Sequence, residues 1–368
     1  MTSQLIGARI KALRERKNLS QEDLAAIFGF NDRQTVSAIE TGERKVSAEE
    51  LMLAVTKLGE PLEYFTDPFR LEGEGRFSWR QTNVPPERLS AYERLAGRWI
   101  AAFRVIAPQV DFEAPTLRTA LRLTRASPFE AAMAAGERFA EEFGLGDVPA
   151  ARLIEVMEKQ FCILVLMVDA FEGISGAACR LPEVDAVLIN RSEVVGRRNF
   201  DLAHELFHIL TWDAMPPERS ESPAEHSKNR VEQLANNFAS ALLMPRRVLE
   251  RFGDWGNQGS KELIAKLNAV SDELQVTASA LKWRLVALGM LKPAFGKEIG
   301  DASLRNNGRG VKADAKPPLL SKLFMEVLAR AIDQGRVSAR RAAGLIDQSI
   351  DEMIELFATH GIAKPDGL

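Results

Sequence analysis

The chain has few of the residues that build disulfides and few of those that bind metal ions. Its 368 residues include only two cysteines and four histidines. Cys162 and Cys179 form no C-x-x-C pair, which excludes a cysteine zinc cluster and argues against a disulfide framework. We therefore expect a protein of the reducing cytoplasm, in which a metal site must draw on a very small set of histidines.

The sequence also lacks long apolar runs. The longest, residues 161–168, is far too short to cross a bilayer, and the first twenty residues are amphipathic and charged, unlike a signal peptide. The net charge of -3 gives no overall basic character, so a nucleic-acid surface would have to be local. These properties favour a cytoplasmic protein that contacts no membrane.

The order of the predicted elements favours an α+β fold that is mostly α. Helical periodicity dominates, and strand-like runs occur only in residues 161–168, 175–179 and 186–190, which predict a small three-stranded sheet. Stretches rich in proline, glycine and polar residues separate the parts of the chain. The predicted parts are five short helices in 1–67, a linker and helical connector in 68–126, the sheet-containing domain in 127–295, a flexible linker in 296–318 and a C-terminal helical region in 319–368.

Two of the four histidines lie four residues apart in a predicted helix with an apolar side. Positions i and i+4 share a helix face, so His204 and His208 can bind one metal ion. Glu205, beside the first histidine, is placed to take a proton from a metal-bound water. The H-E-x-x-H pattern therefore predicts a catalytic zinc site. The alternative is a pair of core or surface histidines with no metal.

A catalytic zinc site needs a third protein ligand and an open position for water. Glu232 is the best candidate because it lies on a predicted helix with a buried apolar face. The alternative for Glu232 is an ordinary exposed helix glutamate. Asn236 lies one turn further on the same face and is placed to hydrogen-bond a ligating histidine. His226 lies in a polar stretch and is more plausible as a loop residue or a donor to the transition state.

The segments FDLAHELFHIL and VEQLANNFASALLMP, in this order, resemble the ImmA/IrrE family of zinc metallopeptidases. The resemblance covers residues 127 to 290 and implies a zincin-like peptidase domain. Matched residue by residue, it implies His204, His208 and Glu232 as zinc ligands and Glu205 as general base. It also implies a substrate class, because members cleave a DNA-binding repressor in a stress or mobile-element response.

Two parts of the peptidase mechanism stay open at this point. An oxyanion donor is required, and His226 and the arginines near Arg197 are weak candidates for it. The sheet edge before the active helix would hold an extended substrate by β-augmentation, or it is purely structural.

The segment LSQEDLAAIFGFNDRQTVSAIETGER resembles the Cro/repressor-type (XRE) helix-turn-helix. A capped second helix, a turn after Gly29 and a short polar third helix suit a domain that reads the major groove of double-stranded DNA. The mild excess of basic residues leaves a protein–protein module of the same shape as the alternative. The predicted contacts are Arg33, Gln34 and Ser37 to base edges and Gln21, Arg44 and Lys45 to phosphates.

Together these features predict a zinc metalloendopeptidase fused to a DNA-binding domain, with Zn²⁺ as cofactor and a repressor-type protein as substrate. One alternative is a transcriptional regulator whose metal site senses zinc or is not catalytic. Another is a toxin–antitoxin or phage-defence component. A homodimer is open as well, because this type of helix-turn-helix commonly reads two half-sites.

Overall fold

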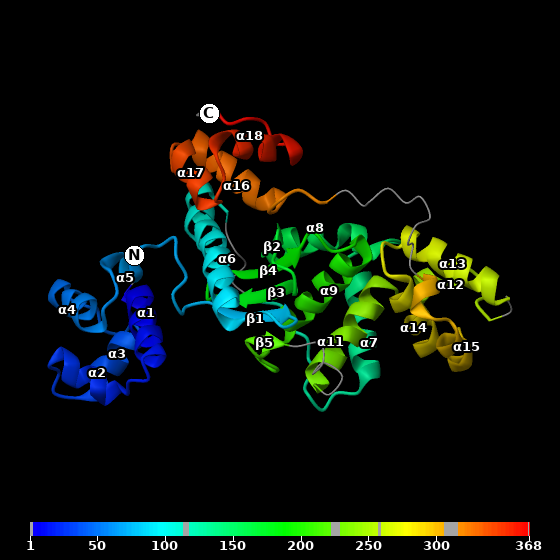
Figure 1. Cartoon of the computed structure of the whole chain (residues 1–368), viewed down its shortest axis with the longest axis horizontal. Coiled ribbons are helices and arrows are strands. Elements are labelled where there is room, and N and C mark those ends of the chain that lie inside the picture. The colour runs from blue at the N-terminus through cyan, green and yellow to red at the C-terminus, as the bar shows by residue number, and fades with distance from the viewer. Residues whose placement is uncertain (1–2, 113–117, 222–228, 257–258, 305–315, 367) are drawn as a thin grey trace.

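The computed structural model describes residues 3–112, 118–221, 229–256, 259–304, 316–366 and 368. Within these residues the chain is mostly helical and contains one mixed β-sheet (Figure 1). The predicted α+β class with a majority of helix is therefore confirmed. His226 lies outside the described residues, so its predicted role as a loop residue or donor stays a prediction.

The N-terminal helices form a small unit with its own apolar core, on the left in Figure 1. Capping boxes start two of its helices, since Ser20 pairs with Asp23 and Ser47 pairs with Glu50. Gly29 ends the second helix in the left-handed conformation, as the predicted turn requires. The five helices are α1 (Ser3–Arg16), α2 (Gln21–Phe28), α3 (Arg33–Glu40), α4 (Ala48–Leu58) and α5 (Leu62–Thr66).

The sheet contains the three predicted strands, but it has five strands in the described residues and not three. The predicted strands are β2 (Ile163–Val168), β3 (Ile174–Arg180) and β4 (Asp185–Asn190). β1 (Arg76–Gln81) comes from the segment predicted as a linker and pairs antiparallel with β3, and β5 (Ser220–Glu221) pairs parallel with β1. The strand order is β2-β4-β3-β1-β5. The prediction missed β1 because its short alternation lies between glycines and prolines, and its pairing partner follows about a hundred residues later.

Both faces of the sheet are covered by helices, which explains the continuous apolar run of β2. One face packs against α7 (Phe129–Glu142), α8 (Pro149–Phe161), α9 (Val195–Thr211) and α11 (Arg230–Leu243). The other face packs against α6 (Pro86–Ile106) and against α16 (Lys322–Asp333), α17 (Ala339–Leu345) and α18 (Ile350–Thr359). The C-terminal helices thus belong to the same core as the sheet, and Ser338 and Ser349 cap α17 and α18.

The remaining helices extend the first face of the sheet at the right of Figure 1. They are α12 (Arg246–Glu250), α13 (Ser260–Glu273), α14 (Ala278–Ala287) and α15 (Pro293–Glu298). Gly136 lets α7 lie very close to α11, because a Cβ at this position would be 2.4 Å from the carbonyl oxygen of Phe238. This tight packing fixes α11 against the sheet layer.

A buried charge cluster joins the N-terminal unit to the rest of the chain. Arg9 of α1 is fully buried, donates to the carbonyl oxygens of Tyr64 and Arg70, and forms an ion pair with Glu74 at 3.1 Å. Arg104 of α6 lies 3.5 Å from the same carboxylate. Removing either partner would leave a buried charge, so this cluster holds the two units together.

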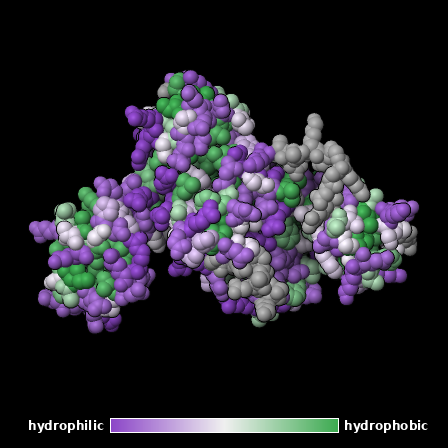
Figure 2. Space-filling model, in the orientation of Figure 1, coloured by the Kyte–Doolittle hydropathy of each residue, from purple (hydrophilic) through white to green (hydrophobic). Residues whose placement is uncertain are grey.

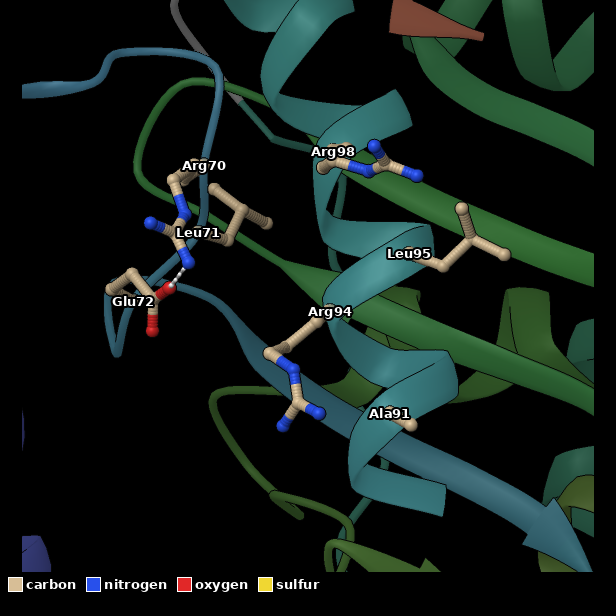
Figure 3. A pocket seen from close by; sticks show the side chains of 7 residues that line it. All are labelled: Arg70, Leu71, Glu72, Ala91, Arg94, Leu95 and Arg98. Atoms are coloured by element: carbon tan, nitrogen blue, oxygen red, sulfur yellow. Dashed lines mark ion pairs between the residues drawn. The ribbon is translucent and has the colours of Figure 1, made fainter. Parts of the chain in front are cut away.

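Beside this junction lies a cavity of about 230 Å³ between residues 70–72 and α6 (Figure 3). Arg70 turns toward Glu72 and pairs with it at 3.1 Å, whereas Arg98 extends to the opposite side in this view and pairs with Asp347 at 3.6 Å. Arg94 is exposed. Arginines line this cavity at the solvated surface of the molecule, and their guanidinium groups do not point toward one common place.

The surface seen in Figure 2 is largely hydrophilic over the central body, and hydrophobic residues gather over the N-terminal helices at the left. Among the exposed large hydrophobic side chains, Met52 and Leu62 belong to α4 and α5. No helix in the described part of the chain has the length and apolar character needed to cross a membrane.

Glu158 of α8 provides a test of the packing between the sheet layer and the C-terminal helices. It is 7% exposed, and burial raises the pKa of its carboxyl to about 7 although Ser321 donates a hydrogen bond to it. Because the pKa of this carboxyl is higher in the folded than in the unfolded chain, the folded state loses stability as the pH rises from the unfolded-state pKa to about 7. This stability is not regained at higher pH. We expect Glu158→Gln to raise the free energy of unfolding at pH 8 by about 1–3 kcal/mol.

The measurement is chemical unfolding of wild type and variant at pH 5 and pH 8. The gain should be much smaller at pH 5, where the wild-type carboxyl is already mostly protonated in the folded state. Glu155→Gln on the exposed side of the same helix is the matched control and should show no such pH-dependent gain, because Glu155 is exposed and pairs with Lys159. Equal gains at both pH values would contradict the prediction.

Candidate metal centre

The two histidines of the H-E-x-x-H pattern lie on the face of α9 that turns into the core. His204 and His208 are each 1% exposed, and Leu202, Leu206 and Phe207 pack into the same apolar layer. The helix places the two imidazoles one turn apart, with ring centroids 4.8 Å from each other. Their Nε2 atoms are 3.0 Å apart, so both rings point at one place.

α11 brings a carboxylate to the same place from a different segment of the chain. Glu232 is fully buried, with Oε2 3.1 Å from Nε2 of His204 and Oε1 3.2 Å from Nε2 of His208. The three residues are the described group whose ligand atoms lie close enough together to hold a metal ion. Glu232 is thus not an ordinary exposed helix glutamate, which was the alternative to a ligand.

The spacing of these donors fits a small tetrahedral metal ion. Two donors that each lie 2.0–2.1 Å from a zinc ion are separated by roughly 3.3 Å, and the three separations here are 3.0, 3.1 and 3.2 Å. Two imidazoles and one carboxylate are also the donor types that zinc takes in hydrolytic sites. The residues present therefore fit the metal that the sequence predicts.

Asn236 of α11 lies beside the ring of His204. Its Oδ1 lies 3.0 Å from Nδ1 of His204, one turn along α11 from Glu232. An amide oxygen accepts from Nδ1–H, which leaves the lone pair of His204 on Nε2, the atom that faces Glu232 and His208.

Burial sets the protonation of the cluster. It lowers the pKa of His204 to about 3, with a further contribution from the nearby Arg80 guanidinium. Burial alone would raise the pKa of Glu232, but its contacts with His204 and His208 hold that pKa well below the usual value. Neutral imidazole and ionised carboxylate are the forms that coordinate a metal ion, so the site needs little proton release to bind one.

Glu205 lies beside the cluster and is 2% exposed. Burial raises the pKa of its carboxyl to about 7, which suits a group that accepts and returns a proton near neutral pH. It lies near Gly176 of β3, where a Cβ would be 3.8 Å from Cγ of Glu205 but only 2.9 Å from the carbonyl oxygen of Leu188 on the neighbouring strand.

The structure adds a cation that the sequence does not predict as a site residue. Arg80 of β1 forms an ion pair with Asp201 of α9 at 3.1 Å, one turn before His204. Asp201 is buried, and Arg197 lies 3.7 Å from its other carboxylate oxygen. Alternation in the segment Phe77-Ser78-Trp79-Arg80 is the one signal in the sequence, since it places the arginine on the face opposite the two aromatic rings.

The residues predicted to contact DNA differ in exposure and in the contacts they make within the N-terminal unit. Arg33 and Gln34 are exposed at the start of α3, Ser37 is half-buried one turn later, and Lys45 is exposed. Gln21 donates to Glu40 at 2.9 Å. Arg44 donates to both carboxylate oxygens of Glu50, at 2.7 and 3.1 Å. The first turn of α3 thus presents the side chains that are freest to reach a DNA base.

Comparison with known protein families identifies two domains in the chain. Residues 10–65 match the model described as helix-turn-helix. Residues 171–285, which carry β3, β4, α9 and α11, match the peptidase model described as IrrE N-terminal-like domain. The chain carries an N-terminal helix-turn-helix domain and an IrrE N-terminal-like domain. The metal cluster lies within the second match, and β1, with Arg80, lies outside it.

Comparisons with whole proteins add little to this result. A comparison with curated proteins found no match. Among solved structures, the apo form of ComR from S. thermophilus aligns over 97% of this chain and 94% of its own, at 14% identity and a TM-score of 0.17. The apo form of the competence regulator ComR from Streptococcus vestibularis aligns over 98% and 99%, at 14% identity and a TM-score of 0.17. A TM-score this low does not show a shared fold.

The cluster predicts metal binding that depends on Glu232. We expect the wild type to bind one zinc ion per chain, and Glu232→Ala to weaken the affinity by more than about 100-fold, since loss of a supporting residue alone costs about 10–100-fold. Equilibrium dialysis followed by elemental analysis measures both quantities. His226→Ala is the matched control and should keep one zinc per chain. Loss of zinc from the His226 variant and not from the Glu232 variant would contradict the assigned ligands.

Proposed function

We propose that the chain is a zinc-dependent endopeptidase fused to a DNA-binding domain. The observation that carries this proposal is the convergence of His204, His208 and Glu232 beside Glu205, inside a domain of peptidase type. Two imidazoles and one carboxylate leave a position open for water, and a general base lies next to it. This combination is that of a hydrolytic site, because a purely structural zinc site is closed by four protein ligands.

The residues of the chain divide the work of hydrolysis between them. A bound zinc ion supplies a water of lowered pKa and polarises the scissile carbonyl. Glu205 accepts the proton of that water and passes it to the departing amine. Asn236 holds the ring of His204 in its coordinating tautomer, and the apolar packing around α9 limits the access of bulk water.

The proposed substrate is a regulatory protein of the repressor type, cleaved in a stress or mobile-element response in the cytoplasm. The fused helix-turn-helix domain supports this choice, since it would place the peptidase where DNA-bound regulators are found. The Arg9–Glu74–Arg104 cluster joins the N-terminal unit to the segment before β1 and to α6, which packs on the sheet, so docking on DNA would also position the peptidase.

A second candidate is a transcriptional regulator in which the metal site senses zinc without cleaving a protein. The same buried cluster favours it, because a change in the N-terminal unit can reach β1 and α6 through these ion pairs. The two candidates differ in a measurable way, since only the regulator requires DNA binding to respond to zinc.

The peptidase predicts that proteolysis depends on Glu205. We expect Glu205→Gln to keep its zinc and its fold but to lower the rate of substrate cleavage by about 10²–10⁴-fold, the usual contribution of a general base. Comparison of the proteomes of cells with the wild type and with the variant would reveal the fragments that disappear, and the purified substrate then gives the rate. Glu218→Gln, at an exposed glutamate nearby in the chain, is the control and should cleave normally. Unchanged fragments in the Glu205 variant would refute the mechanism.

The helix-turn-helix domain predicts sequence-specific DNA binding through the start of α3. We expect Arg33→Ala with Gln34→Ala to weaken binding to an operator selected from random duplexes by about 10-fold or more, because each lost base contact costs about 1–3 kcal/mol. Lys57→Ala, an exposed charge on α4, is the control. Fluorescence anisotropy measures the affinity at two salt concentrations. Repeating it with and without zinc separates the candidates: unchanged affinity favours the peptidase, and a large change favours the sensor.

A further inference from the structure

A peptidase of the proposed kind needs a donor for the negative charge that develops on the scissile carbonyl oxygen. His226 lies outside the described residues, and Arg197 has a side chain that is 48% exposed at the rim, where it pairs with Glu193 and Asp201. Arg197 is therefore not held as a preorganised donor. Among the residues that the structure describes, Arg80 is a second cation near the cluster, from a strand outside the matched peptidase domain.

The register of the sheet places Arg80 beside the general base. Arg80 of β1 lies directly opposite Gly176 of β3, and a Cβ at Gly176 would lie 3.8 Å from Cγ of Glu205. Phe77 and Trp79 pack into the core on the α6 side, so Ser78 and Arg80 face α9. The arginine side chain therefore leaves the sheet on the side of Glu205 and reaches Asp201 of α9.

An ion pair with Asp201 holds the guanidinium of Arg80 in place, and a buried N–H group of the guanidinium has no acceptor among the described residues. Its side chain is 14% exposed and its Nη1 lies 3.1 Å from Oδ1 of Asp201. Nε is also buried, and it donates no hydrogen bond to any part of the chain that the structure describes. A buried donor without an acceptor is costly, and a ligand oxygen in the site would remove that cost.

The charges around the site also favour the binding of a ligand oxygen at Arg80. Asp201, Glu205 and Glu232 bring three carboxylates into one buried region, and the largely buried Arg80 pairs with one of them. A divalent ion and one guanidinium together offset three negative charges. A substrate oxygen that gains negative charge then meets two positive groups, of which only the guanidinium can donate hydrogen bonds.

We propose that Arg80 is the residue that binds the developing oxyanion of the substrate, with Asp201 holding its guanidinium in place. The inference rests on the proposed function, since it assigns a further catalytic residue to the same site. It gives β1 a role in the chemistry, because the strand outside the matched domain would complete the active site.

The test uses inorganic phosphate as a tetrahedral anion and the full-length chain loaded with Co²⁺ in place of zinc. Phosphate bound beside the metal changes the visible absorption of cobalt, so a titration gives its affinity without any substrate. We expect Arg80→Gln to retain one cobalt per chain and to bind phosphate at least about 10-fold more weakly than the wild type, as expected for loss of a charge-assisted donor. Arg197→Gln removes the same charge from the other side of Asp201 and is the matched control, with an affinity within about twofold of the wild type.

A double variant separates a directed donor from a simple effect of charge or folding. Arg80→Gln with Asp201→Asn leaves no unpaired buried carboxylate and keeps the net charge of the wild type. We expect it to bind cobalt with a normal spectrum and still to bind phosphate weakly. Phosphate affinity restored by the double variant, unchanged by Arg80→Gln, lost in Arg197→Gln instead, or absent from the cobalt-loaded wild type would each overturn the assignment. A wild type that binds no cobalt would refute the metal site itself, which is a different outcome.

Discussion

The packing of α11 against α9 is the contact on which the rest of the site depends. It brings a fully buried glutamate into the space between two buried imidazoles, where an unpaired carboxylate would be very costly. The close approach of α7 at Gly136 fixes α11 from its other side. A fold that holds three polar groups together in an apolar layer has arranged in advance most of what a metal ion needs.

The sheet contributes more than support to this arrangement. Gly176 of β3 lies beside Glu205, and β1 provides Arg80 opposite that glycine. The other face of β1 buries Phe77 and Trp79 under α6, and the C-terminal helices share that core. The segment before the peptidase match and the segment after it therefore stabilise the strand that carries Arg80.

The same region connects the two domains. Glu74 receives Arg9 of the helix-turn-helix domain and Arg104 of α6, and β1 starts two residues after it. A short stretch of chain thus runs from the contact with the N-terminal unit to Arg80 beside the metal cluster. This stretch lies outside both matched domains.

Local sequence determined the features that depend on neighbours in the chain. The helix periodicity, the capping serines, the H-E-x-x-H pair on one helix face and the face shared by Glu232 and Asn236 all follow from spacing alone. Only the tertiary structure decided which distant segments meet. β1 pairs with a strand about a hundred residues later, and an arginine between glycines and prolines carries no local sign of that partner. The pairing of β1 and the ion pair between Arg80 and Asp201 join residues that are far apart in the sequence. Their physical cause therefore lies in the packing of the whole sheet and not in the segment that forms β1.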